Sequence, residues 1–155
     1  MAINNKIMTI SWYTKSFEDL SANELYEILS LRSVVFVVEQ NCVFLDTDHK
    51  DQKCMHLMGW NENDLVAYCR IVPPGIAYKE PSIGRVVSSP KYRGTGSGRM
   101  MMEKAIAITR ELFDNQPIRI GAQLYLEKFY SSLGFEPQGD IYLEDGIKHV
   151  EMICI

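Results

Sequence analysis

A glycine-rich turn between a strand and a helix limits what this chain can fold into more than any other feature. The apolar run Ile83–Val87 predicts a buried strand, and a series of good helix formers follows the glycines. Glycines leave the backbone N–H groups uncovered, and the first N–H groups of a helix are unpaired and carry partial positive charge. The segment therefore predicts a phosphate-binding loop. Its glycines are Gly94, Gly96 and Gly98.

The same segment is basic, although the chain as a whole is acidic. Residues 83–102 contain four basic residues and no acidic one, whereas the 155-residue chain has a formal net charge of −4. The basic residues are Arg85, Lys91, Arg93 and Arg99. General nucleic-acid binding needs a basic field over a wide surface, so we expect no nucleic-acid partner. We expect instead a phosphorylated cofactor that one loop holds.

Length and composition predict a soluble cytoplasmic protein with one domain over residues 1–155. The hydrophobic fraction of 46% and the charged fraction of 23% are ordinary for globular proteins. No apolar run is long enough to cross a membrane, and the N-terminus lacks the pattern of a signal peptide. We therefore expect no membrane partner.

The four cysteines lack CxxC spacing and are expected to be reduced and mostly buried. The alternative is a metal site built from cysteines and histidines of one segment. Its candidate ligands are Cys42, His49, Cys54 and His56. Their spacing does not match structural zinc modules, so we expect no metal.

The chain before the glycines reads as strands around one helix. Lys6–Tyr13 alternates between apolar and polar residues, as a strand with one buried face does. Ser21 and Glu24 form a capping-box pattern that predicts a helix start, and the β-branched run Val34–Val38 leaves the helix end open. The polar segment Asn41–Lys53 predicts a loop.

The remaining pattern predicts a mixed α/β fold, of the α+β kind, rather than an evenly alternating doubly wound sheet. The helix after the glycines has an apolar stripe formed by Met101, Ala105, Ile108 and Leu112. The other predicted elements are strands over Cys54–Trp60 and Leu65–Val72 joined by a hairpin turn, a strand over Ile118–Gly121, a helix over Leu124–Leu133 stopped by Gly134, and a closing hairpin about Glu144–Gly146.

Several motifs resemble the GNAT N-acetyltransferase superfamily. Arg93, Gly96 and Gly98 match in full the acyl-CoA signature Gln/Arg-x-x-Gly-x-Gly/Ala, and Phe129–Phe135 resembles the family's FY…GF segment. The chain also resembles the ElaA-type subgroup over nearly its whole length. The segments that carry this resemblance are Leu31–Cys42, DTDHKD with His56-Leu57, IGRVVSS, Gly121–Gln123 and Glu144–Met152. Ser97, where a bulky apolar residue is usual, and Lys148, where proline is usual, depart from the pattern.

The resemblance implies a GNAT-type fold, with a central, mostly antiparallel sheet flanked by helices. Its parallel strands four and five splay apart, and acetyl-CoA, the co-substrate, lies in the gap. The main chain of Val86 and Val87 would pair with the pantetheine arm, and an N–H near Val87 would polarise the thioester carbonyl. The pyrophosphate would be bound by the loop residues Arg93, Gly94, Thr95, Gly96, Ser97, Gly98 and Arg99.

The resemblance also assigns Tyr130 as the general acid that protonates the CoA thiolate, while its helical spacing alone fits a core aromatic residue. For the base that deprotonates the amine we consider Glu39, His56, Glu144 and His149, of which His56 fits a structural histidine equally well.

Three polar residues near the predicted site have alternative structural roles. Gln123 would either hydrogen-bond the cofactor amides or cap a helix. Arg32 and Arg85 are expected to pair with buried carboxylates such as Glu39 or Asp51.

The function implied is an N-acetyltransferase that moves an acetyl group from acetyl-CoA to a primary amine by direct attack in a ternary complex. The acceptor is a small molecule or a peptide, and a homodimer is one option for the assembly. The acidic loop with Asp46, Asp48 and Asp51 either favours a cationic amine or is only solvated surface. The alternative function is a non-catalytic acyl-CoA-binding or sensing module. A nucleotide hydrolase ranks lower, because the loop lacks the Gly-Lys-Ser/Thr ending. A dinucleotide enzyme also ranks lower, because no acidic ribose-binding residue follows a second parallel strand.

Overall fold

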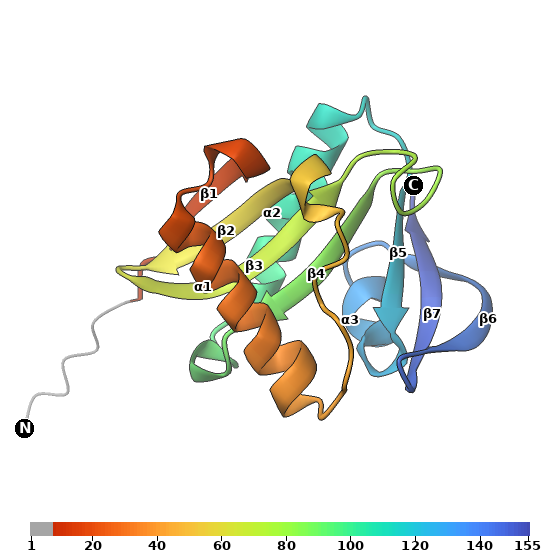
Figure 1. Cartoon of the computed structure of the whole chain (residues 1–155). Helices are drawn as coiled ribbons and strands as arrows, with labels where there is room; N and C mark the ends of the chain where they lie inside the picture. The colour runs from red at the N-terminus through yellow and green to blue at the C-terminus, as the bar shows by residue number, and fades with distance from the viewer. Residues whose placement is uncertain (1–7) are drawn as a thin grey trace, which may run out of the picture.

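The computed structural model describes residues 8–155 as two antiparallel sheets with helices packed on their faces (Figure 1). The first sheet has the order β1-β2-β3-β4 and the second has the order β5-β7-β6. The strands are β1 (Ser11–Ser16), β2 (Met55–Asn61), β3 (Asp64–Val72), β4 (Ser82–Ser88), β5 (Ile118–Gln123), β6 (Glu136–Glu144) and β7 (Ile147–Cys154). The helices are α1 (Ala22–Arg32), α2 (Ser97–Leu112) and α3 (Glu127–Ser131). Helix α1 covers one face of the first sheet and α2 covers the other (Figure 1).

Strands β4 and β5 run side by side in the same direction and then part (Figure 1). The backbone N–H of Arg119 donates to the carbonyl of Pro81 at 3.0 Å, which joins the two strands where they begin. Beyond that bond the strands belong to separate sheets. The mixed α/β fold with splayed strands four and five is therefore confirmed.

Helix α1 begins at the predicted capping box. The Ser21 hydroxyl accepts from the Glu24 N–H at 3.0 Å, and the Glu24 carboxylate accepts from the Ser21 N–H at 2.9 Å. The α-helical turns end at Arg32, and the chain continues as a π-helix over Ser33–Glu39. The sequence did not predict where this helix ends, and the wider π turns occupy the β-branched run. Such turns are frequent at functional sites.

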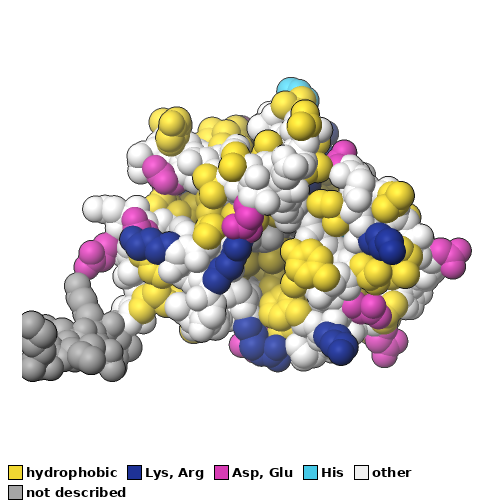
Figure 2. Space-filling view, turned by 90° about the horizontal axis from the view of Figure 1, so that it is seen from below, with side chains coloured by type: hydrophobic (Ala, Val, Ile, Leu, Met, Phe, Trp, Pro, Cys, Tyr) yellow, Lys and Arg dark blue, Asp and Glu magenta, His cyan; other side chains and the backbone are white. Residues whose placement is uncertain are grey.

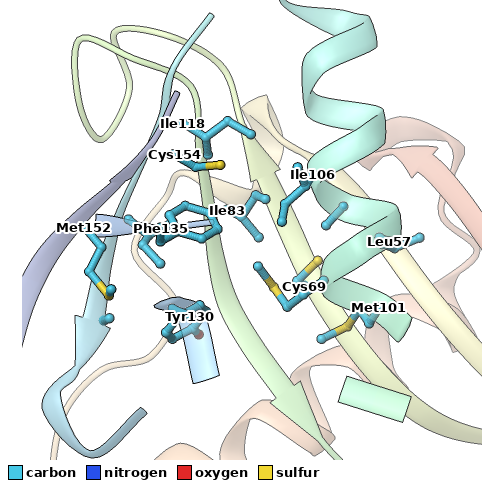
Figure 3. Packing of buried hydrophobic residues seen from close by; sticks show 14 of the residues in the cluster. Leu57, Cys69, Ile83, Met101, Ile106, Ile118, Tyr130, Phe135, Met152 and Cys154 are labelled. Carbon is cyan, nitrogen blue, oxygen red and sulfur yellow. The ribbon is translucent and has the colours of Figure 1, made fainter. Parts of the chain in front are cut away.

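Helix α2 packs on β3 and β4 through a face slightly different from the predicted stripe. Met101 and Ala105 are buried as expected, but Leu112 is 46% exposed, and the stripe was wrong at that position. The helix instead buries an adjacent row of positions spaced by four and then three residues, namely Met102, Ile106 and Thr109. Figure 3 shows Met101 and Ile106 of α2 facing the same core as Cys69, Ile83 and Phe135.

The remaining elements agree with the sequence apart from their boundaries. The predicted first strand lies partly outside the described residues, and its strand pairing begins at Ser11. The predicted helix over Leu124–Leu133 is a 3₁₀ turn, Leu124–Leu126, followed by the short α3. The helix ends at Ser131, and a turn over 132–134 follows in which Gly134 has φ +97°. Both predicted hairpin turns are present. Within residues 8–155, no helix is long and apolar enough to cross a membrane.

Candidate active site

A cavity of about 1110 Å³ occupies the gap between β4 and β5. Every residue of β4 lines it, and the other walls come from β5, α3, the end of the π-helix and the β6–β7 turn. Figure 2 views the molecule from below Figure 1 and shows a recessed apolar area with acidic and basic side chains beside it. Because the two strands separate here, their facing backbone edges are open to a ligand.

The glycine-rich loop places a row of backbone N–H groups beside this cavity. Gly94 and Gly96 have φ values of +78° and +82°, which glycine adopts at little cost. The N–H groups of residues 94–96 donate no hydrogen bond to another described residue. Helix α2 then begins with Gly96 at its N-cap and no side-chain cap. Residues 94–99 therefore present unpaired donors at a helix N-terminus, the arrangement that binds phosphate.

The basic side chains of the loop contact neighbouring elements. Arg93 makes a bidentate ion pair with Glu39 of the π-helix, with Nη1–Oε2 and Nη2–Oε1 distances of 2.9 and 2.6 Å. These hydrogen bonds lower the pKa of the Glu39 carboxyl group, which makes it a poorer base. Arg99 donates to the Ser132 hydroxyl at 2.9 Å and lies 3.3 Å from Glu103.

The segment after the π-helix crosses from the loop to the second sheet. Beside Glu39, the Gln40 side chain accepts a hydrogen bond from Gln123 Nε2 of β5 at 3.3 Å. Cys42 Sγ donates to the carbonyl of Asp145 in the β6–β7 turn at 3.3 Å. Gln123 therefore lines the cavity, and its side chain makes no cap bond at the start of the 3₁₀ turn.

Strand β4 is bulged where it faces the cavity. Tyr68 and Arg70 of β3 pair with Val87 and Gly84, so two residues of β4, 85 and 86, oppose one residue of β3. Arg85 has φ +48°, a left-handed conformation that costs an L-residue roughly 1–2 kcal/mol. The bulge takes the peptide groups of residues 85 and 86 out of the ladder. They become available to a ligand in the cavity.

Tyr130 of α3 combines a packed ring with a hydroxyl group at the cavity. The ring meets Phe129 and Phe135 edge-on at centroid distances of 5.2 and 6.0 Å, and Figure 3 shows it at the border of the core. The hydroxyl has no hydrogen-bond partner among residues 8–155, although Tyr130 lines the cavity. Burial raises the pKa of Tyr130, so its proton is retained at neutral pH. The packed ring therefore fits a core aromatic residue, and the unpartnered hydroxyl group at the cavity fits the predicted general acid.

Of the four candidate bases, His149 has the geometry that best suits proton uptake. Its Nδ1 lies 2.8 Å from the Ile147 carbonyl, which assigns the proton to Nδ1 and leaves Nε2 as the acceptor. Nε2 lies 3.5 Å from Glu144 Oε2, and the ring stacks on Tyr142. An imidazolium formed by proton uptake at Nε2 would be stabilised by the Glu144 carboxylate. Both His149 and Glu144 line the cavity.

His56 lies outside the cavity lining and is engaged on both ring nitrogens. Nδ1 is 2.8 Å from the Tyr68 hydroxyl and Nε2 is 2.9 Å from the Asp51 carbonyl. Burial lowers the pKa of His56. This placement favours the structural role. Its neighbour Cys54 donates to the Lys50 carbonyl, and burial raises the pKa of that thiol to about 11.

Three arginines and three aspartates form an ionic cluster between the loop 41–54 and the first sheet, buried except for the partly exposed Arg85 and Asp48. Arg32, fully buried, bonds Asp46 at 2.7 Å and Asp51 at 2.8 Å. Arg70 of β3 bonds Asp48 at 2.6 Å and Asp51 at 2.8 Å. The third arginine, Arg85, pairs with Asp46 and Asp48. Arg32 meets Asp51 as expected, whereas Arg85 does not meet Glu39. The three aspartates are therefore anchored parts of the fold.

Comparison with known proteins decides the family. Residues 38–155 match the family described as the acetyltransferase (GNAT) domain. The chain belongs to the GNAT acetyltransferase family.

Relatives of this GNAT chain match it over nearly its full length. Protein ElaA of Escherichia coli is 39% identical over 145 residues, which are 92% of this chain and 95% of that protein. A UPF0039 protein of Synechocystis is 42% identical over 147 residues, which are 94% of this chain and 96% of that protein. The predicted resemblance to the ElaA-type subgroup is confirmed.

Solved structures agree with this GNAT assignment. An acyl-CoA N-acyltransferase from Pseudomonas aeruginosa superposes with a TM-score of 0.90 at 38% identity, covering 95% of this chain and 100% of that chain. The structure of E. coli ElaA gives a TM-score of 0.89 at 38% identity with the same coverage. The chain therefore has the fold of an acyl-CoA-utilising family.

One close approach at the wall of this GNAT cavity was not predicted from the sequence. Tyr78, from the loop before β4, lines the cavity, and its hydroxyl group meets that of Tyr142 of β6, which lies outside the lining, above Gly121 of β5. A Cβ atom on Gly121 would lie 2.8 Å from each hydroxyl oxygen. A glycine inside a strand often indicates that another group approaches the backbone closely, so Gly121 was the sequence feature that could have predicted this contact. Phe44 and Leu45, which also line the cavity, gave no comparable signal.

Proposed function

We propose that this protein transfers an acetyl group from acetyl-CoA to a primary amine, by direct attack of the amine within a ternary complex. The row of unpaired N–H groups at residues 94–99, at the mouth of the β4–β5 cavity, carries this proposal. It offers donors to the CoA pyrophosphate, and the basic loop attracts the charge. The residues present therefore fit acetyl-CoA as the co-substrate.

The pantetheine arm would run along β4, because the bulged strand offers free peptide groups beside Val86 and Val87. A backbone N–H in this stretch would donate to the thioester oxygen as negative charge develops there. Removing one such donor typically costs about 100- to 1,000-fold in rate. Tyr130, with its unpartnered hydroxyl in the same cavity, would protonate the departing CoA thiolate.

His149 is the base that we propose, with Glu144 as its partner. The amine arrives as an ammonium ion and must lose a proton before it attacks. Nε2 of His149 would take that proton, directly or through a water molecule, and Glu144 would stabilise the resulting imidazolium. Glu39 is less suited because Arg93 already holds its carboxylate.

We expect His149→Gln to lower kcat about 100-fold, because positioned proton transfer is usually worth this much or more. The KM for acetyl-CoA should change little. Raising the pH should restore part of the rate, since more of the amine is then already deprotonated. Steady-state kinetics across pH measure both effects. His49→Asn, at an exposed loop position with φ +59°, is the matched control and should behave as the wild type. An unchanged kcat in His149→Gln would remove this residue from the mechanism.

A thermal-shift titration with acetyl-CoA, ATP and NAD, followed by a screen of amine acceptors, tests the proposed function. A ligand stabilises the state that it binds, so acetyl-CoA should raise Tm while ATP and NAD should not. Transfer to at least one amine should follow. Binding without transfer to any amine would favour the non-catalytic acyl-CoA-binding module. The cytoplasmic location and the homodimeric assembly are still predictions made from the sequence.

A further inference from the structure

Arg85 is the one non-glycine residue with positive φ inside a strand of residues 8–155. The other non-glycine residues with positive φ lie in loops and tight turns. Most of those are Asn, Asp or His, which tolerate this conformation better than arginine does. A large side chain is therefore held in an unfavourable backbone conformation at the point where β4 faces the cavity.

The side chain of Arg85 is anchored at three points. Nε lies 2.8 Å from Asp46 Oδ1, and Nη2 lies 2.9 Å from the Asp46 carbonyl and 3.4 Å from Asp48 Oδ2. The anchor is itself fixed, because Asp46 also binds the buried Arg32 of α1, and Asp48 also binds Arg70 of β3. Asp46 is only 7% exposed, so water competes little for its contacts with Arg85, whereas Asp48 is more exposed, at 21% of its side chain.

The anchored residue sits inside the bulge. Residues 85 and 86 together oppose one residue of β3, and ordinary ladder pairing resumes at Val87. If residue 85 returned to an extended conformation, the peptide groups of residues 85 and 86 would rotate away from their present directions. Nothing in the backbone alone favours the left-handed conformation at this position, because it is not a glycine.

We propose that Arg85 is a positioning residue, whose ion pairs with Asp46 and Asp48 hold the β4 bulge in the shape that presents its backbone to the acyl group. This inference rests on the proposed function. It gives the acidic loop 41–54 a role in the reaction, since that loop fixes the strand that would bind the thioester. Arg85 acts here through the backbone, without a contact to the reacting atoms.

The test separates side-chain anchoring from backbone shape. Arg85→Ala loses the ion pairs and keeps the cost of positive φ, whereas Arg85→Gly loses the ion pairs but adopts positive φ freely. We expect kcat to fall about 100-fold in Arg85→Ala, as when an oxyanion donor is lost, and to stay within about 10-fold of wild type in Arg85→Gly. Acetyl-CoA affinity by calorimetry should fall much less than kcat in both, because the loop at 94–99 still binds the pyrophosphate. If Arg85→Ala is too unstable to assay, Arg85→Gln replaces it, since it keeps the bulk and the backbone cost but loses the charge.

Arg119→Ala is the matched control, because Arg119 of β5 also pairs with two carboxylates, those of Glu80 and Glu151. It should retain wild-type kcat. Wild-type kcat in Arg85→Ala, or an equally slow Arg85→Gly, would overturn the inference while leaving the transferase proposal intact. Failure of the wild type to bind acetyl-CoA or to acetylate any amine would instead overturn the proposed function.

Discussion

Asp51→Asn is expected to lower the free energy of unfolding by about 3–5 kcal/mol, the usual cost of breaking a buried ion pair by removing one partner. Asp51 accepts hydrogen bonds from Arg32 and Arg70 at 2.8 Å each, and its side chain is 9% exposed. The substitution keeps the shape of the residue but leaves excess positive charge in the cluster. Urea unfolding at pH 7 measures the loss. The control is Asp114→Asn, at an exposed turn, which should change stability by less than about 0.5 kcal/mol.

The same cluster predicts how the free energy of unfolding changes as the pH is lowered. Burial by itself would raise the pKa of Asp51, but the hydrogen bonds and charges of Arg32 and Arg70 lower it further than burial raises it. The folded-state pKa is therefore below the unfolded value of about 4. The stabilisation is complete above that pH and is lost as pH falls through the folded-state pKa. Wild type should thus lose more stability between pH 7 and pH 3 than Asp51→Asn does. Equal losses in the two proteins, or a loss of less than 1 kcal/mol on substitution, would contradict this description of the cluster.

Tyr130→Phe is expected to lower kcat by about 100-fold or more, because the variant keeps the packed ring and loses the proton donor. Acetyl-CoA affinity should stay within about twofold, since the loop donors are unaffected. Single-turnover kinetics and calorimetry measure the two quantities. Tyr26→Phe, at a 71% exposed position of α1, is the control for removing a tyrosine hydroxyl. Wild-type turnover in Tyr130→Phe would leave this tyrosine as a core aromatic residue only.

Local patterns predicted much of this fold because short-range contacts specify them. The capping box at Ser21 and Glu24, the hairpin turn at Asp145-Gly146 and the glycines that begin α2 all depend on neighbouring residues. Their backbone preferences are therefore readable in sequence. The family resemblance added the splay of β4 and β5, which periodicity alone does not predict.

The parts that sequence did not predict depend on contacts between distant segments. Arg85 looks like an ordinary strand residue, and its positive φ is visible only once Asp46, far earlier in the chain, is placed beside it. The pairing of Glu39 with Arg93 rather than Arg85 follows from where the π-helix ends. His56 and His149 both precede apolar residues in sequence. Both are buried, and only their hydrogen-bond partners and their places relative to the cavity separate the structural histidine from the one that lines the cavity.

Isothermal titration calorimetry with acetyl-CoA, on the wild type and on Gly96→Val, tests most directly whether the backbone of residues 94–99 binds the cofactor. Gly96 has φ +82° and open space around it, so the added side chain changes the loop backbone and covers its N–H groups without a clash. Gly139→Val, at φ +76° with equally open space in β6, controls for the conformational cost alone. We expect saturable binding to the wild type and to Gly139→Val, and at least about tenfold weaker binding to Gly96→Val. Absence of binding to the wild type, or equal affinity in all three proteins, would show that these backbone groups do not bind acetyl-CoA.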